Sequence, residues 1–169
     1  MAWDEIGESV CPVARSLAVL GDRWTMLIIR ELFLGTRRFD VFQAQTGMSP
    51  HVLSTRLKRL EDDGVIERRR YQLRPPRYEY RLTAKGRDLH GVILALRAWG
   101  LQWCDFDPAD KPAVELFHTA CGGRVEPAAV CCDCGKPLRP HDITVRLGDA
   151  FAAERAVRGS PSGVAKDTT

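Results

Sequence analysis

Apolar side chains recur at helical spacing near the beginning of the chain. Val13, Leu17 and Leu20 lie three or four positions apart, behind a proline that suits the first turn of a helix. Asp22 can then cap a second helix over about residues 23–34, which is apolar over much of its surface. The pattern predicts two consecutive helices, the second of them central to a hydrophobic core.

The next two predicted helices are joined by a short turn that contains glycine. The first is expected over residues 39–46, and Gly47 follows it. Ser49 is a natural cap and Pro50 a natural first residue for the second helix, which Gly64 ends. The buried stripe of this second helix is expected to be Val52, Leu53, Leu57 and Leu60. Two helices in this arrangement are typical of a helix-turn-helix.

Strand patterns come next. Residues 65–73 are rich in β-forming side chains, Arg-Pro-Pro at 74–76 interrupts them, and residues 77–82 alternate between apolar and polar. This predicts a β-hairpin whose loop carries arginine and proline. Thr83 can cap a long last helix over about residues 84–104. The order of elements predicts a winged helix-turn-helix, so the expected fold class is α+β, mainly α.

The composition changes after this last helix, where short strand patterns are punctuated by cysteine and glycine. We expect a DNA-binding and dimerisation domain over residues 1–106 and a linker over 107–115. A small zinc-ribbon-like β module is expected over 116–147, and a small-residue, polar tail over 148–169 is expected to be disordered.

Composition limits the class of protein. A chain of 169 residues with 44% hydrophobic side chains can bury a core. It has no apolar run of the roughly 18 residues that would suggest a membrane span, and its acidic N-terminus does not resemble a signal peptide. We therefore expect a cytoplasmic protein without a membrane partner. In that reducing compartment, its 6 cysteines are better explained as metal ligands or reactive thiols than as disulfides.

The net charge of +3 is unevenly distributed. Residues 36–87 hold 13 Lys/Arg and 6 Asp/Glu, a balance of +7, while the remainder holds 12 and 16, a balance of −4. A basic block inside an otherwise acidic chain favours a polyanionic partner. For any single residue, the alternative is that its charge only solvates an exposed helix or hairpin.

Four stretches of the chain resemble the HxlR-type family of winged-helix regulators. They are CPVARSLAVLGDRWTMLIIREL, GTRRFDVFQ, MSPHVLSTRLKRLEDDGVIERRRY and PPRYEYRLTAKGRDL, in the family's order and spacing, within residues 11 to about 104. The resemblance implies a dimeric transcription factor, often a repressor, and some members of the family sense electrophiles or oxidants. The C-terminal extension lies outside the pattern that carries the resemblance.

The helix that begins after Ser49 is the expected recognition helix, because the major groove of B-DNA admits an α-helix whose side chains read base edges. The candidates for base or near-base contacts are Ser49, His51, Ser54, Thr55 and Arg56. Lys58 and Arg59 are expected to contact phosphates, which position a protein on DNA without reading its sequence. In the hairpin, Arg70, Arg74 and Arg77 are expected along the backbone or in the minor groove.

The first and last helices carry more apolar side chains than so small a domain can cover, Trp99 and Trp103 among them. Pairing about a two-fold axis would bury these side chains and present two recognition helices to a double-stranded, inverted-repeat operator. The alternative is that both tryptophans pack inside the protomer or against the extension.

The extension contains two pairs of metal-ligand type. His118 and Cys121 form one pair, Cys131 and Cys134 the other, and a glycine follows each pair. The glycine favours a tight turn after the second ligand of each pair. Two such turns can supply the four nitrogen and sulfur ligands of a tetrahedral, structural Zn²⁺ site. Cys132 or His141 could replace one of these ligands. The alternatives are a metal-free hairpin module or a Cys–Cys bridge in oxidised protein.

Cys11 precedes the first helix, where the helix dipole can make a thiol more reactive, and it matches the position of the reactive cysteine in redox-sensing members of the family. It is a candidate redox sensor, and the alternative is a small buried contact. Cys104 is expected in the core. A small-molecule effector that binds between the dimerisation helices also remains possible.

No catalytic set is visible, so we expect no enzyme. A thiol oxidoreductase built on Cys131 and Cys134 lacks the βαβ context that such enzymes have. The remaining alternative is a zinc-dependent module that binds protein or nucleic acid and uses the winged helix as a scaffold.

Overall fold

The structure is a computed structural model that describes residue 7 and residues 10–105, 113–125, 134–136, 142–149, 152–153 and 156. The chain forms two compact units, Met1–Ile93 and Leu94–Thr169, and each has its own cluster of buried apolar side chains. No helix among the described residues is both long enough and apolar enough to cross a membrane.

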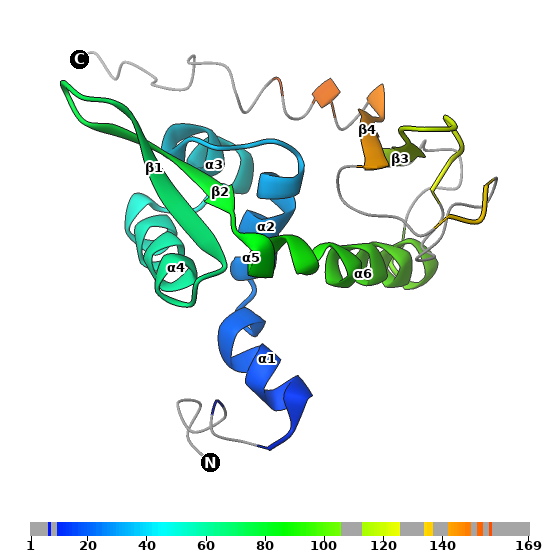
Figure 1. Ribbon diagram of the computed structural model, residues 1–169, viewed down its shortest axis with the longest axis horizontal. Helices are drawn as coiled ribbons and strands as arrows, with labels where there is room; N and C mark the ends of the chain where they lie inside the picture. The colour runs from blue at the N-terminus through cyan, green and yellow to red at the C-terminus, as the bar shows by residue number, and fades with distance from the viewer. Residues whose placement is uncertain are drawn as a thin grey trace, which may run out of the picture. The chain divides into compact units, whose positions relative to one another are not determined.

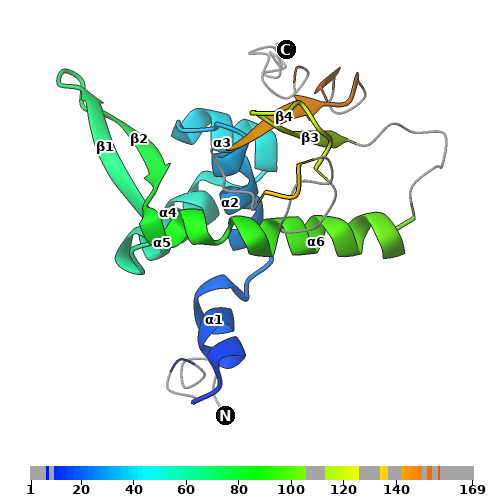
Figure 2. The same cartoon turned by 45° about the vertical axis from the view of Figure 1, so that its right-hand side comes forward.

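The first unit is a winged helix-turn-helix, as the sequence predicts. Its elements in chain order are α1 (Pro12–Leu20), α2 (Thr25–Phe33), α3 (Phe39–Thr46), α4 (Pro50–Asp62), β1 (Ile66–Gln72), β2 (Arg77–Leu82) and α5 (Ala84–Asp88) (Figure 1). Helix α6 (His90–Trp103) begins in this unit and continues in the second. Figures 1 and 2 show α2, α3 and α4 grouped together and the β1–β2 hairpin extending away from them.

Helix α2 is central to the core of the first unit, as its apolar surface predicts. Ile28 and Ile29 are completely buried, and Leu32 is nearly so. The other buried members of this core are Phe42, Met48, Leu53, Leu57, Leu60, Val65 and Ile66. The predicted stripe of α4 is therefore buried except for Val52, which is half-buried and packs against the same core. Burial of these apolar side chains is the main term that stabilises the arrangement of α2, α3 and α4.

One carboxylate is buried beside this core. Glu31 in α2 has no exposed surface, and its oxygens accept hydrogen bonds from Thr36 Oγ1 at 2.9 Å and Arg30 Nη2 at 3.0 Å. The backbone N–H of Thr36 also donates to the Glu31 carbonyl at 2.9 Å. Because a buried charge needs such partners, Glu31 holds the turn after α2 in place.

Both ends of α4 have the predicted signals. The Ser49 hydroxyl accepts a hydrogen bond from the Val52 N–H at 3.4 Å, and Pro50 is the first helical residue. After α4, Gly64 adopts φ +67, a left-handed conformation that glycine tolerates and most residues avoid. The sequence therefore fixes the length and the direction of this helix locally.

The hairpin is antiparallel, with Ile66 opposite Leu82 and Arg70 opposite Tyr78. Its base is joined to the helices by a hydrogen bond from the Tyr80 N–H to the Arg37 carbonyl at 2.8 Å. Gly86 in α5 lies so close to this base that a Cβ there would be 2.1 Å from the Val65 carbonyl oxygen. Any larger residue at this position would push α5 away from the hairpin.

The long last helix predicted over 84–104 is interrupted, and this prediction is wrong in that respect. Helix α5 ends at Asp88, Leu89 is its C-cap, and α6 starts at His90. The Leu89 N–H donates to the Gly86 carbonyl at 3.2 Å, an i to i+3 bond that tightens the end of the helix. Gly86 packs closely against the Val65 carbonyl and so holds α5 at the base of the hairpin.

In the second unit, β3 (Val114–His118) pairs with β4 (Ile143–Leu147) in an antiparallel sheet. The small core here consists of Leu94, Leu116 and Val125, with Val114 and Ile143 packed against it. Arg97 of α6 donates from Nη2 to the Val114 carbonyl at 2.9 Å and so joins the helix to the strand. The tail expected over 148–169 lies mostly outside the described residues.

Candidate nucleic-acid interface

The predicted base-contact residues lie on the exposed side of α4, except for Arg56, which is half-buried. Ser49, His51, Ser54 and Thr55 are exposed, opposite the buried Leu53, Leu57 and Leu60. The Thr55 hydroxyl donates to the His51 carbonyl one turn earlier, at 2.9 Å, and its lone pairs stay available. Lys58, one of the two predicted phosphate contacts of α4, is exposed as well.

Arg56 and Arg59 bind other parts of the protein itself. Arg56 Nε lies 3.4 Å from Asp22 Oδ1, and its side chain is 28% exposed. Arg59 Nη2 donates to the Ala18 carbonyl at 2.6 Å, and its Nε is 3.9 Å from Asp63 Oδ2. These two arginines join α4 to the segment that holds α1 and the start of α2, a role that the sequence pattern did not reveal.

The β1–β2 hairpin is the wing of the fold, and its arginines divide into two sets. Arg68, Arg69 and Arg81 form ion pairs with glutamates at 3.9, 2.5 and 2.7 Å. Arg70, Arg74 and Arg77, the three predicted DNA contacts, are exposed, and none of them has an ion pair with another described residue. The second set is the more available to phosphates because no carboxylate neutralises it.

Arg37, at the base of the wing, has a different role. Burial, and to a lesser degree the neighbouring Arg81, lower the pKa of its guanidinium below its usual value. Its Nη1 donates to the carbonyls of Leu32 at 2.6 Å and Thr36 at 2.9 Å. Arg37 therefore stabilises the connection between α2 and α3 and is not part of the DNA-facing set.

In the second unit, three of the four predicted metal ligands come together. His118 Nδ1 is 3.1 Å from Cys121 Sγ and 3.5 Å from Cys134 Sγ, and all three ligand atoms lie within 4.8 Å of one another. His118 is 3% exposed, whereas both cysteines are exposed. The fourth predicted ligand, Cys131, lies outside the described residues.

The backbone around these ligands supports the prediction of two tight turns. Gly122 and Gly135, each directly after a cysteine of the cluster, have φ of +69 and +66. The Gly122 N–H donates to the His118 carbonyl at 2.8 Å and closes the first turn. In a tetrahedral zinc site, nitrogen and sulfur ligands lie roughly 3.6 Å apart. The cluster is close to that spacing, so these residues could hold a metal ion.

The model of the HxlR-like helix-turn-helix family matches residues 19–108, more than half of the chain. The chain belongs to the HxlR-like helix-turn-helix family. Proteins similar to it include the HTH-type transcriptional regulator YodB of Bacillus subtilis, which is 35% identical over 65% of this chain and 98% of its own length. The protein is a DNA-binding transcriptional regulator of this family.

Two other similar proteins extend beyond the core of the HxlR-like family. The uncharacterized HTH-type transcriptional regulator Rv3095 of Mycobacterium tuberculosis is 38% identical over 150 residues, which are 89% of this chain and 92% of its own length. The crystal structure of PA1607, a candidate transcription factor, has a TM-score of 0.65 and 36% identity and covers 83% of this chain and 96% of its own. A similarity this long includes much of the second unit, of which the family model covers only residues 94–108.

A structure of HypR, a redox regulator, in its reduced form is also similar, with 32% identity and a TM-score of 0.52 over 54% of this chain and 92% of its own.

Two cysteines of this HxlR-like chain lie outside the metal cluster. Cys11 is the N-cap residue of α1 and is exposed, so the alternative expectation of a small buried contact does not hold for it. Cys104 is exposed too, and the prediction that it lies in the core is wrong. It follows the end of α6, beyond the part of the helix that packs on β3.

Proposed function

We propose that this regulator binds an inverted-repeat operator as a homodimer, most simply as a repressor, on the DNA of the nucleoid in the cytoplasm. The observation that carries the proposal is the exposed side of α4, where Ser49, His51, Ser54 and Thr55 stand beside Lys58. A helix with short hydroxyls and an imidazole at its N-terminal end can enter the major groove and approach base edges there.

In this proposal, the wing and the remaining basic residues contact the backbone. Arg70, Arg74 and Arg77 are the contacts of the wing, and Lys58 and Arg59 are the contacts of α4. Arg56 is retained among the base contacts. To reach a base edge, it has to exchange its ion pair with Asp22 for a hydrogen bond to DNA.

Dimerisation is supported by exposed apolar side chains on two helices. On α6, Leu96, Trp99 and Trp103 are 50%, 61% and 66% exposed, so the two tryptophans are not covered within the protomer. On α1, Val13 and Leu17 are 66% and 45% exposed, and no residue of that helix is buried. Exposed apolar side chains such as those on each of these helices are typical of an interface between subunits. We propose that residues 1–106 contain both the DNA-binding and the dimerisation surfaces.

Fluorescence anisotropy of the reduced protein tests the proposal, with the duplex upstream of its own gene against a scrambled duplex of equal length. We expect tight binding to the native duplex, weakened steeply by salt because phosphate contacts release counterions. Equal, weak binding to both duplexes would contradict a sequence-specific regulator. That result, combined with dependence on metal, would favour the alternative, a zinc-dependent interaction module that uses the winged helix as a scaffold.

We also propose that His118, Cys121, Cys131 and Cys134 hold a structural Zn²⁺. The support is the convergence of the three described ligands and the two left-handed glycines that follow the cysteines. Nitrogen and thiolate ligands suit zinc, and the bound ion would stabilise a unit whose apolar core is small.

Cys11 is proposed as the redox-sensing residue, because it is exposed at the beginning of α1 and because HypR, a similar protein, is a redox regulator. Oxidation or alkylation of Cys11 would alter α1, part of the proposed dimer surface, and release DNA. Alkylation of this thiol that leaves the affinity for the operator unchanged would contradict the proposal.

A further inference from the structure

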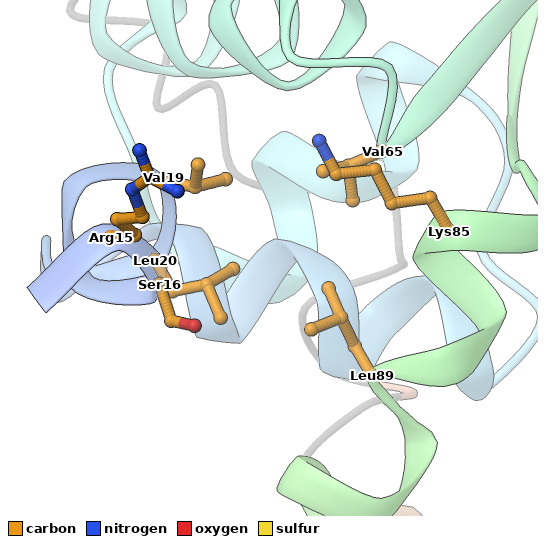
Figure 3. A pocket seen from close by; sticks show the side chains of 7 residues that line it. All are labelled: Arg15, Ser16, Val19, Leu20, Val65, Lys85 and Leu89. Atoms are coloured by element: carbon orange, nitrogen blue, oxygen red, sulfur yellow. The ribbon is translucent and has the colours of Figure 1, made fainter. Parts of the chain in front are cut away.

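A cleft of about 240 Å³ lies in the first unit, and Figure 3 shows the side chains that line it. One wall is α1, and the other is formed by the residue before β1, by α5 and by the residue after α5. The residues that line it are Arg15, Ser16, Val19, Leu20, Val65, Lys85 and Leu89. None of them belongs to the proposed DNA contacts or to the metal cluster.

The lining combines an apolar floor with two cations. Val19, Leu20 and Leu89 are half-buried and pack against the core, and Val65 is buried in it. Arg15 and Lys85 come from opposite walls, and Figure 3 shows their nitrogen atoms toward the same side of the cleft. No hydrogen bond or ion pair joins the guanidinium of Arg15 to another described residue, so it is available to a ligand.

We infer that this cleft binds a compact organic anion, whose carboxylate lies between Arg15 and Lys85 and whose apolar body contacts Leu20 and Leu89. Charge complementarity supports the carboxylate, because both cations face one edge and no acidic residue lines the cleft. The volume is below the roughly 300 Å³ at which pockets for drug-sized ligands begin. A single ring or a short alkyl chain therefore fits it better than a larger ligand.

Both walls of the cleft are hydrogen-bonded to the last turn of α4. Lys85 Nζ donates to the carbonyl of Asp63, the C-cap of α4, at 2.6 Å. From the other wall, the Ala18 carbonyl accepts from Arg59 Nη2, also at 2.6 Å. A ligand that changes the spacing of the walls acts on both bonds and so on the orientation of α4. The anion is thus an effector of DNA binding, a part of the inference that rests on the proposed function.

Direct binding is the first test. Benzoate and hexanoate are titrated into the full-length protein by isothermal calorimetry, beside benzamide, hexanamide and inorganic phosphate. We expect saturable binding of at least one carboxylate, one molecule per chain, and about tenfold weaker binding of its neutral amide. Binding of phosphate alone would show a simple anion site and overturn the inference, as would the absence of saturable binding by both carboxylates.

Substitutions identify the site. Arg15→Gln should weaken binding by about tenfold, and Ser16→Phe should abolish it by filling the cleft without changing a charge. Arg87→Gln is the matched control, because Arg87 lies on the same α5 but does not line the cleft. Circular dichroism confirms that each variant is folded. Equal binding by folded Ser16→Phe and the unchanged protein would overturn the inference.

The effector role is tested separately, by repeating the anisotropy measurement with saturating benzoate or hexanoate. We expect the affinity for the operator to change at least about threefold, and this change to be absent in Ser16→Phe. Unchanged affinity despite calorimetric binding would overturn the effector role. A protein that binds the carboxylate but prefers no duplex would contradict the proposed function and leave the binding site standing.

Discussion

Asp22 Oδ1 lies 3.4 Å from Arg56 Nε and also accepts hydrogen bonds from the N–H groups of Trp24 and Thr25, at 2.9 and 3.1 Å. Its other oxygen accepts from the Thr25 hydroxyl. One carboxylate thus caps the beginning of α2, as the sequence predicts, and fixes α4 relative to it. The cap is local, but the ion pair joins residues that are far apart in the sequence.

Replacing this carboxylate should destabilise the protein. Asp22→Ala removes a helix cap and one partner of a half-buried ion pair, so we expect the free energy of unfolding to fall by about 1–2 kcal/mol. Urea unfolding followed by circular dichroism measures the change. Asp40→Ala is the control, because Asp40 is 65% exposed and pairs only with an exposed Arg38. An equal loss in both variants would contradict the double role of Asp22.

Arg56 and Lys58 should differ in their effect on DNA binding. Arg56→Ala is expected to reduce the preference for the operator more than it reduces nonspecific affinity, because a lost base contact affects only the correct sequence. Lys58→Ala should weaken binding to both duplexes similarly and reduce the salt dependence by about one counterion. Anisotropy at several salt concentrations measures both. Lys136→Ala, the same change in the second unit, is the control. An equal loss of specific and nonspecific binding in Arg56→Ala would exclude Arg56 as a base contact.

The proposed dimer should dissociate when its apolar surface is charged. Trp103→Glu places a carboxylate where the interface is proposed, so we expect a monomer in sedimentation equilibrium and weaker operator binding. Leu73→Glu is the matched control for the sedimentation measurement, because Leu73 is 69% exposed in the wing, compared with 66% for Trp103. A Trp103→Glu variant that remains dimeric would show that the interface lies elsewhere.

Metal content tests the cluster of His118, Cys121 and Cys134. Protein purified without a chelator should contain about one zinc ion per chain, and Cys134→Ser should lower this content because serine is a poor zinc ligand. Chelation should unfold the β3–β4 unit, since metal binding contributes directly to the folding of small domains. Cys104→Ser, which removes an exposed cysteine outside the cluster, is the control. Metal-free, fully folded protein would refute the site.

His90 should make stability depend on pH. Its ring lies 5.0 Å from that of Phe33, and burial lowers the pKa of its imidazole below the usual 6.5. Between the lowered pKa and 6.5, the unfolded chain binds more protons than the folded one. Stability therefore rises with pH through this window. Below the lowered pKa, the protein has lost all of the stability that depends on neutral His90.

The expected result is a smaller free energy of unfolding at about pH 5.5 than at about pH 7, with part of this difference absent in His90→Leu. Urea unfolding at the two pH values measures it. The exposed His51, replaced by glutamine, is the control. If the His90→Leu protein keeps the whole pH dependence of the original chain, other groups are responsible for it.

Much of the fold follows from signals that act over a few residues. The cap at Ser49, the proline after it and the left-handed Gly64 set the bounds of α4. The glycines after Cys121 and Cys134 set the two turns of the metal cluster in the same local way. Because caps, turns and apolar periodicity depend on neighbouring residues, the sequence alone determined the order of the elements and the residue types of the candidate sites.

The tertiary structure decided which side chains are free to act. Arg56, Lys58 and Arg59 are all predicted DNA contacts in the sequence. Packing, however, places Arg56 against Asp22 and Arg59 against the Ala18 carbonyl, 41 residues away. Packing also seats α5 against the base of the hairpin, where Gly86 approaches the Val65 carbonyl too closely for any other residue. These relationships depend on burial and on contacts between distant segments, and no local pattern of residues encodes such contacts.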